Sequence, residues 1–292
     1  MTETGKGVAA LVLACIIWGL APIFYKELSH VDPAEVLGHR TLWSFVTFGG
    51  VLVLQGRLSA MVAALSVPRQ LGLTCLAAVF ITINWFVFIW AIAVGRALEG
   101  SIGYYIFPLV AVVAGWLVLG ERLARVQWLA VGLAAAAVLV LTLGLGVAPW
   151  VSIVLAVSFT CYGLIKRWID AGPVVSVTVE TLLLAPIMLV FLAMRGESAF
   201  GGTSFDTIML VLSGPVTAVP LILFSYAAKR VAMTTMGLIQ YMNPTLQFLV
   251  AWQLFGEPVT GWHGLALPMI WLALAIYSVS AIRRARRGAA PT

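Results

Sequence analysis

The chain has 292 residues, of which 62% are hydrophobic and only 10% are charged, and its mean hydropathy is +1.06. Soluble proteins carry about 25% charged residues, so this composition excludes a soluble globular domain and indicates a protein that lies in a bilayer. The net charge of +6 does not indicate nucleic-acid binding, because the basic residues are scattered singly between apolar runs and gather only in the RRARR of the C-terminus. That distribution suits a membrane surface.

The sequence carries no signature of metal or nucleophilic chemistry. Cys15, Cys75 and Cys161 all fall inside apolar runs, which indicates neither a disulfide framework nor a zinc site. There is no G-x-x-x-x-G-K-[ST] loop, no H-E-x-x-H and no G-x-S-x-G, and the three histidines lie far apart in the sequence. We therefore expect no cofactor, no metal, no catalytic residue and no ATP hydrolysis by this chain.

Ten segments are long and apolar enough to cross a bilayer core of ~30 Å, which takes about 20 residues per helix. They are apolar on every face and none alternates with period two, so they are predicted to be spanning helices and not surface helices or barrel strands. The first is not expected to be a cleaved signal peptide, because no small-residue cleavage site follows it. The segments lie near 8–26, 34–54, 71–94, 98–119, 126–145, 149–168, 174–194, 207–228, 233–255 and 262–282.

Lysines and arginines are distributed unevenly over the alternate loops between these segments. With the N-terminus in the cytoplasm, thirteen of the seventeen lie in cytoplasmic segments, three lie outside (Lys26, Arg96 and Arg195), and Arg40 lies inside a helix. Positive charge accumulates on cytoplasmic loops. We therefore predict that both termini lie in the cytoplasm.

One stretch of the chain occurs twice. Residues 104–121 read YYIFPLVAVVAGWLVLGE and residues 240–257 read QYMNPTLQFLVAWQLFGE, and Tyr, Pro, Trp, Gly and Glu coincide at a single spacing of 136 residues. The two stretches end the fourth and ninth spans, so the repeating unit is five helices long and must insert upside down the second time. The alternative is that membrane helices resemble one another by composition alone.

Shorter similarities fit the same unit. Residues 18–20 read WGL where residues 162–164 read YGL, and Arg40-Thr41-Leu42 follows a proline at the same spacing as Glu180-Thr181-Leu182. Inverted five-helix repeats are a transporter device, because two similar halves in opposite orientations can exchange conformations. We predict two such halves, residues 1–146 and residues 147–292.

Several motifs are also specific enough to indicate a family. They are IIWGLAPIFYK (16–26), EVLGHRTLWS (35–44), NWFVFIWA (84–91), LEGSIGYYIFPL (98–109), GERLARVQWLAV (120–131), CYGLIKR (161–167), ETLLLAP (180–186) and GLIQYMNPT (237–245). On these motifs, nearly the whole chain resembles the RarD group of the EamA family, in the drug/metabolite transporter superfamily. This resemblance implies a ten-helix inner-membrane transporter with two EamA halves and a central cavity lined chiefly by helices 1, 3, 4, 6, 8 and 9.

The prolines and the terminal glutamates of the repeat have different expected roles. Pro108 and Pro244 lack an N–H and leave a carbonyl about four residues earlier without a helical partner, which hydrocarbon tolerates only beside protein or water. We predict that both prolines are hinges in a cavity wall; the alternative is that prolines are simply common in membrane helices. Glu121 and Glu257 follow glycines at helix ends, where a loop contact is expected.

Deep aromatic and polar side chains are the candidate walls of a substrate cavity. Trp18 lies about ten residues, roughly 15 Å, into the first span, which is too deep for an interfacial belt. Aromatic walls with a few polar groups suit apolar or aromatic solutes, although each indole alone is equally compatible with plain packing. The candidates are Trp18, Asn84, Trp85, Trp90, Tyr104, Tyr105, Tyr162, Gln240, Tyr241 and Asn243.

Charges inside the bilayer are costly and therefore informative. Arg40, Glu180 and Lys166 are the candidates for recognition of substrate charge or for proton coupling, and a neutralised pair that only fixes helix orientation is the alternative. The expected partners are Lys166 or Arg167 for Glu180, and Glu35 or Glu27 for Arg40.

Two classes of function fit these observations. The first is a secondary transporter that exports a small amphipathic or aromatic metabolite or drug-like solute by alternating access. The second is an intramembrane enzyme that acts on a lipid-soluble substrate, against which the missing catalytic motifs argue. The expected partners are a small-molecule substrate and the lipid bilayer, with no nucleic acid. A homodimer stays open, since small-residue spacings such as Ala111-x-x-x-Gly115 pack helices within one chain or between two.

Overall fold

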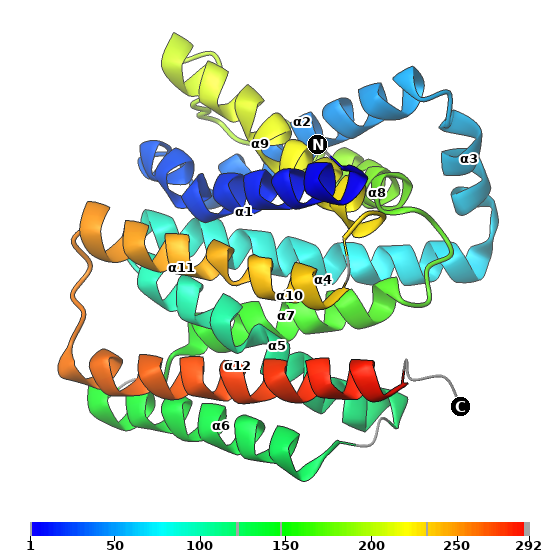
Figure 1. Ribbon diagram of the computed structural model, residues 1–292. Coiled ribbons are helices and arrows are strands. Elements are labelled where there is room, and N and C mark those ends of the chain that lie inside the picture. Colours follow the sequence, from blue (N-terminus) through cyan, green and yellow to red (C-terminus); the bar gives the residue numbers. More distant parts are fainter. Residues whose placement is uncertain (1, 121–122, 147, 232, 289–292) are drawn as a thin grey trace.

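The structure is a computed structural model that describes residues 2–120, 123–146, 148–231 and 233–288, and every regular element in these ranges is helical (Figure 1). The elements are α1 (Glu3–Glu27), α2 (Pro33–Leu54), α3 (Leu58–Ser66), α4 (Pro68–Ala93), α5 (Ala97–Leu119), α6 (Arg125–Leu145), α7 (Trp150–Lys166), α8 (Pro173–Ala193), α9 (Ser204–Ala228), α10 (Met233–Gln240), α11 (Met242–Leu249), the π-helix η1 (Val250–Leu254) and α12 (Gly261–Gly288).

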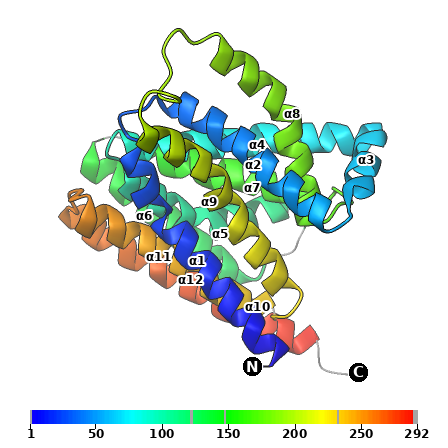
Figure 2. The same ribbon diagram turned by 90° about the horizontal axis from the view of Figure 1, so that it is seen from above.

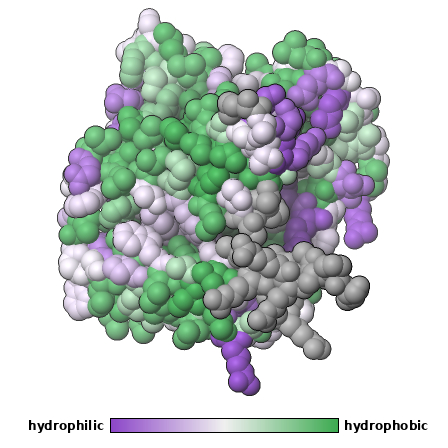
Figure 3. All heavy atoms as spheres, in the orientation of Figure 1, coloured by the Kyte–Doolittle hydropathy of each residue, from purple (hydrophilic) through white to green (hydrophobic). Residues whose placement is uncertain are grey.

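The described helices have the length and surface of membrane spans. Eight of them, α1, α2, α4, α5, α6, α8, α9 and α12, are long and apolar enough to cross a bilayer, and α7 is apolar but has only 17 residues. Large apolar side chains face outward, with Leu54 89%, Met194 81% and Leu143 74% exposed. In Figure 3 hydrophobic residues spread over the middle of the visible face. These features confirm an all-helical integral membrane protein.

Both ends of the described chain lie on one side of the bundle. Helix α1 begins and α12 ends on the side that carries α3, as Figures 1 and 2 show. We call this side the termini face. The opposite face holds the loops that precede α2, α5, α7, α9 and α12.

Two segments differ from the sequence-based expectation. The nine-residue α3 was not predicted; at about 1.5 Å per residue it is too short to cross the bilayer, and it joins α2 to α4 at the termini face. The expected ninth span, 233–255, is not one continuous α-helix but divides into α10, α11 and η1. Pro244 cannot donate a backbone hydrogen bond to the carbonyl of Gln240, and the α-helix is interrupted at Tyr241, between these two residues.

The helices pair across the two expected halves in a reciprocal way. Helix α1 packs against α9 and α11, and its expected counterpart α7 packs against α4 and α5. The remaining contacts include counterpart pairs: α2 with α8, α5 with α11 and α6 with α12. If the two halves are exchanged, each of these helix–helix contacts therefore becomes a contact of the same set.

Close helix crossings depend on glycine. A Cβ atom on Gly103 in α5 would lie 2.8 Å from the backbone oxygen of Ser152 in α7, and one on Gly19 in α1 would lie 2.6 Å from Cβ of Leu246 in α11. Real Cβ atoms do not approach other heavy atoms so closely. Glycine thus lets α5 approach α7, and α1 approach α11, to backbone contact, as small residues do at membrane helix interfaces.

Polar contacts join the two halves at the opposite face. The Glu257 carboxylate accepts hydrogen bonds of 2.7 Å from the backbone N–H groups of Ala97 and Leu98, the first residues of α5. It thereby satisfies two of the donors that a helix N-terminus leaves free. Burial raises the pKa of this carboxyl above its usual range, although the same two donors act in the opposite direction. The loop contact expected for Glu257 is confirmed, whereas Glu121 lies outside the described residues.

We predict opposite effects for alanine at two glycines of α5. Gly103→Ala forces a Cβ against the backbone of Ser152 and is expected to destabilise the protein by about 1–3 kcal/mol, as overpacking does. Gly100→Ala meets only ordinary contacts at 3.8 Å or more and is expected to leave stability unchanged or slightly raised, since alanine favours a helix. Thermal melting in detergent measures both; equal melting temperatures for the two variants would refute the close crossing.

Candidate functional site

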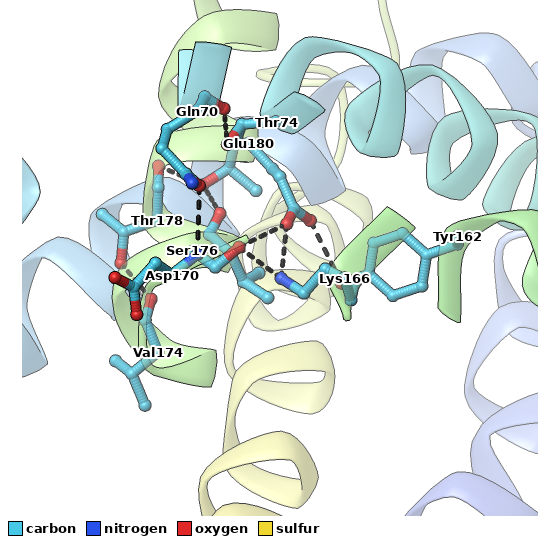
Figure 4. Close-up of polar contacts among 11 residues, drawn as sticks. Gln70, Thr74, Tyr162, Lys166, Asp170, Val174, Ser176, Thr178 and Glu180 are labelled. Atoms are coloured by element: carbon cyan, nitrogen blue, oxygen red, sulfur yellow. Dashed lines mark hydrogen bonds and ion pairs between the residues drawn. The ribbon is translucent and has the colours of Figure 1, made fainter. Parts of the chain in front are cut away.

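A buried ion pair lies between α7 and α8, near the termini face (Figure 4). Glu180 of α8 is 1% exposed, and its Oε1 accepts a hydrogen bond of 2.6 Å from Nζ of Lys166. Ser176, one turn earlier on α8, donates to the same oxygen at 2.9 Å and also accepts a hydrogen bond from Lys166. The hydroxyl of Tyr162 donates to Oε2 at 3.1 Å. Both carboxylate oxygens are therefore satisfied.

The local sequence explains this arrangement. Tyr162 and Lys166 are four residues apart on α7, and Ser176 and Glu180 are four residues apart on α8, so each pair lies on one side of its helix. A carboxylate in a bilayer needs a partner that neutralises its charge, and Lys166 supplies it while keeping 20% of its own side chain exposed. The predicted pairing of Glu180 with Lys166 is confirmed.

Arg40 of α2 has a different environment. Its guanidinium lies over the ring of Trp85 at 4.3 Å and over that of Tyr25 at 5.3 Å. The residue is 8% exposed, and its Nε and Nη1 atoms are buried without a hydrogen-bond partner. No ion pair of Arg40 occurs among the described residues.

The expected pairing of Arg40 with Glu35 is wrong. Glu35 lies in the first turn of α2, where the loop before α9 reaches it: Oε1 accepts hydrogen bonds from Ser198 and from the backbone of Ala199, at 2.7 and 2.8 Å. Its other oxygen lies 3.6 Å from Arg195. The second candidate, Glu27, is exposed. The carboxylates expected for Arg40 are thus occupied by other groups or exposed at the end of α1.

A polar contact connects three helices beside Arg40. Asn84 of α4 is 1% exposed, and its amide donates to the carbonyl of Leu155 at 3.0 Å and to the hydroxyl of Ser158 at 3.1 Å, both on α7. The hydroxyl of Tyr104 on α5 donates to its carbonyl oxygen at 3.0 Å. This network fixes the orientation of the Tyr104 ring, because every polar atom of the Asn84 side chain is engaged.

Aromatic rings form a continuous series from the Arg40 site to the Glu180 site. Neighbouring ring centroids in the series lie 5.8–6.2 Å apart, within the range of favourable aromatic contacts. The first ring lies under the Arg40 guanidinium, and the last carries the hydroxyl bound to Glu180. In order, the rings are Tyr25, Phe88, Tyr104, Phe159 and Tyr162.

A second group of predicted residues lies where α1 and α5 meet α11. The hydroxyl groups of Tyr105 and Thr245 are 2.8 Å apart, and Thr245 donates in turn to the carbonyl of Tyr241. The amide of Gln247 donates to Oδ1 of Asn243 at 2.9 Å and to the backbone carbonyl of Trp18 at 3.3 Å. These bonds surround the interruption before Pro244. The expectation that both groups face one common cavity stays a prediction.

Three further predicted residues lie apart from these contacts. Trp90 packs on Trp150 at 5.1 Å and under Arg96, near the opposite face. Gln240 ends α10 and is partly buried, and Pro108 lies inside an uninterrupted α5. The hinge role of Pro108 and Pro244 stays a prediction. A surface hollow of about 350 Å³ beside Gly201 and Thr207 contains none of the predicted cavity residues.

Sequence reasoning missed four residues of this region. Phe88 and Phe159 complete the aromatic series, Ser176 binds Glu180, and Thr245 binds Tyr105. A phenylalanine in an apolar helix has no mark that separates packing from a cavity wall. Ser176 had a usable signal, because a hydroxyl four residues before a buried glutamate lies on the same side of the helix.

The comparisons with known proteins agree with this architecture. A family model described as the EamA-like transporter family matches residues 5–143, the first of the two expected halves. The protein RarD of Streptomyces exfoliatus is 43% identical over 280 residues, which cover 94% of this chain and 88% of that protein. The chain belongs to the EamA-like transporter family. Within this family, proteins named RarD are relatives of this chain, as the sequence motifs predicted.

Two further relatives extend this EamA assignment over the full length. An uncharacterized transporter of Vibrio cholerae is 38% identical and covers 96% of this chain and 94% of its own. The protein RarD of Escherichia coli K12 is 36% identical, with 98% of both chains covered. A protein of known crystal structure superposes with a TM-score of 0.60 at 18% identity, covering 96% of this chain and 98% of its own; it shares the fold. These findings indicate a membrane transporter and not an enzyme.

We predict that the charges of Lys166 and Glu180 are strongly coupled in this EamA protein. Lys166→Met leaves a carboxylate that is 1% exposed without its cation, and we expect a loss of about 3 kcal/mol. Glu180→Gln costs less, because the partly exposed lysine remains hydrated. The double variant Lys166→Met/Glu180→Gln recovers most of the loss of the first. Thermal melting of all four proteins measures the coupling, and purely additive losses would contradict it.

Proposed function

We propose that this protein is a secondary transporter of the inner membrane that exports a small amphipathic or aromatic solute. In this proposal the chain makes ten crossings, with α7 and the combined α10, α11 and η1 completing the eight longer spans, and α3 lies at the membrane surface. Residues 1–146 and 147–292 form inverted halves, and both termini are cytoplasmic. The loop charges of the sequence and the position of both ends on one face support this orientation.

The observation that carries the proposal is the aromatic series between the two buried charged sites. It begins beside Arg40 in the first half and ends on Glu180 in the second. Rings of α1, α4, α5 and α7 contribute to it. An apolar or aromatic solute finds favourable stacking along such a surface, and the charged sites at its ends lie near opposite faces of the bundle.

Alternating access requires contacts between the halves that open in turn. At the opposite face, Glu35 of the first half binds Ser198 and Arg195 of the second. At the termini face, Gln70 of α4 accepts a hydrogen bond of 3.0 Å from the backbone of Asp170 and donates to the carbonyl of Trp168 (Figure 4). We propose that these two groups of contacts are the gates. The reciprocal packing of the helices supports an exchange between two such states.

Glu180 is the proposed proton carrier. Its carboxylate is stable in the bilayer while Lys166 and Ser176 bind it. Movement of α7 away from α8 would remove the cation and favour protonation, because burial disfavours the charged carboxylate. One proton would then cross with each cycle between the two states.

Reconstitution of the purified protein in liposomes tests the transport proposal. A panel of radiolabelled aromatic and amphipathic solutes is loaded inside, and we expect release of at least one to depend on the protein. Mass spectrometry of the released solute separates the two classes of function, since a transporter returns it unaltered and an enzyme changes it. Protein-independent release of every solute would contradict the proposal.

Glu180→Gln provides the test of proton coupling. The amide keeps the shape of the side chain but does not titrate, so the variant is expected to retain solute exchange between equal compartments. It should fail to accumulate solute when a pH gradient is imposed across the membrane to drive accumulation. Glu99→Gln is the matched control, because Glu99 is paired with Arg96 near the opposite face and away from α8. Accumulation by Glu180→Gln at the parental level would show that Glu180 only pairs with Lys166.

The orientation is tested by thiol labelling in intact cells. In a background without Cys15, Cys75 and Cys161, we introduce Gln55→Cys after α2 at the termini face, or Ser204→Cys at the start of α9 on the opposite face. Both positions are exposed. An impermeant maleimide added outside should label Ser204→Cys and not Gln55→Cys until the membrane is permeabilised. Labelling of Gln55→Cys alone would reverse the proposed topology.

A further inference from the structure

Arg40 and Glu180 occupy equivalent positions in the two expected halves, eight residues into α2 and α8. The two sites nevertheless differ in how their charge is balanced. Glu180 has a lysine, a serine and a tyrosine on its two oxygens. Among the described residues, Arg40 has the ring faces of Trp85 and Tyr25 beside its charge, and two of its nitrogen atoms are buried without an acceptor from this part of the chain.

Burying an unpaired guanidinium in this position costs free energy. Buried charges in proteins are paired or hydrogen-bonded, and intramembrane arginines mark ligand or ion pathways. The aromatic faces offset part of the positive charge but accept no hydrogen bond in the plane of the guanidinium. The hydroxyl of Tyr25 is likewise buried without a partner. The described residues therefore supply no anionic acceptor at this site.

The buried or half-buried glutamates at the opposite face, from which α2 begins, are bound elsewhere. Glu35 is held by Ser198, Ala199 and Arg195, and Glu99 is paired with Arg96 at 2.6 Å. Glu257 caps the start of α5. Each of these carboxylates would have to leave an existing contact to reach Arg40. An acceptor from outside the chain needs no such rearrangement.

We propose that Arg40 binds the carboxylate of the transported solute, whose apolar part lies against the aromatic series. The inference rests on the proposed transport function and specifies its substrate class: a small organic anion with an aromatic or otherwise apolar body. A guanidinium is planar and presents fixed donors that suit a carboxylate. Trp85 and Tyr25 lie against the guanidinium, and from Tyr25 the rings continue through Phe88 and Tyr104 toward α7.

Three probes of nearly equal shape test the charge preference. Indole-3-acetate, indole-3-acetamide and tryptamine carry a negative, a neutral and a positive group on the same ring. Their dissociation constants for the full-length protein in detergent are measured by equilibrium dialysis. A charged hydrogen bond contributes enough to separate the anion from the amide by about tenfold or more. We expect indole-3-acetate to bind most tightly and tryptamine least tightly.

Variants assign the preference to Arg40. Arg40→Gln should lose it, so that acetate and acetamide bind within about twofold of each other. Arg40→Lys keeps the charge without the planar donors and should retain a reduced preference, which also decides the matter if Arg40→Gln does not fold. Arg96→Gln is the matched control: Arg96 also lies over two indoles, those of Trp90 and Trp150, but it already has Glu99 as its anion. It should keep the parental preference.

The outcomes separate this inference from the transport function. Equal binding of the three probes, no binding of any probe, or an anion preference that survives in Arg40→Gln would overturn the inference. Liposome flux is measured with the same probes. Flux of the neutral or cationic probe without anion preference would leave transport intact and overturn the role of Arg40. Carboxylate binding at Arg40 without flux of any solute would support the site and contradict the transport proposal.

Discussion

The bilayer offers no water to a buried charge, and this constraint organises the interior of the protein. Every carboxylate that the structure buries in its described part is held by donors: Glu180 by Lys166 and Ser176, Glu35 by the loop before α9, Asp206 by Thr203, and Glu257 by the start of α5. The contacts of Glu35 and Glu257 also join segments that are distant in the sequence. The same requirement makes Arg40 exceptional, since its guanidinium is buried against aromatic faces and no described residue supplies a counter-ion.

The resemblance between the two halves gives this exception its meaning. The proposed five-helix unit, used twice, would place similar helices in equivalent surroundings, and the contacts between the described helices are reciprocal. The charges are not: the position that holds an arginine in the first half holds a glutamate in the second. In the proposed mechanism, the rings from Tyr25 to Tyr162 join these two sites, and an anionic solute follows them from Arg40 toward Glu180.

Sequence reasoning found what local composition encodes. The apolar lengths predicted the eight described helices that are long enough to cross a bilayer, and the nearness of two opposite charges predicted the Glu180 and Lys166 pair. Sequence reasoning did not predict how the chain responds to each proline. The α-helix is interrupted at Tyr241 before Pro244 and continues into the π-helix η1, whereas Pro108, in the same sequence pattern, leaves α5 uninterrupted. Glu35 is five residues before Arg40, whereas helix neighbours are three or four residues apart, and Ser198, 163 residues later in the chain, donates to its carboxylate.

An experimental structure of the protein with indole-3-acetate bound tests the central claim most directly. The account predicts a carboxylate oxygen within hydrogen-bond distance of Nε or Nη1 of Arg40, with the indole ring against Trp85, Tyr104 or Phe159. It also predicts that the Lys166 and Glu180 site stays free of the ligand's carboxylate. A structure in which Arg40 is paired with a protein carboxylate, and in which the ligand lies elsewhere, would contradict it.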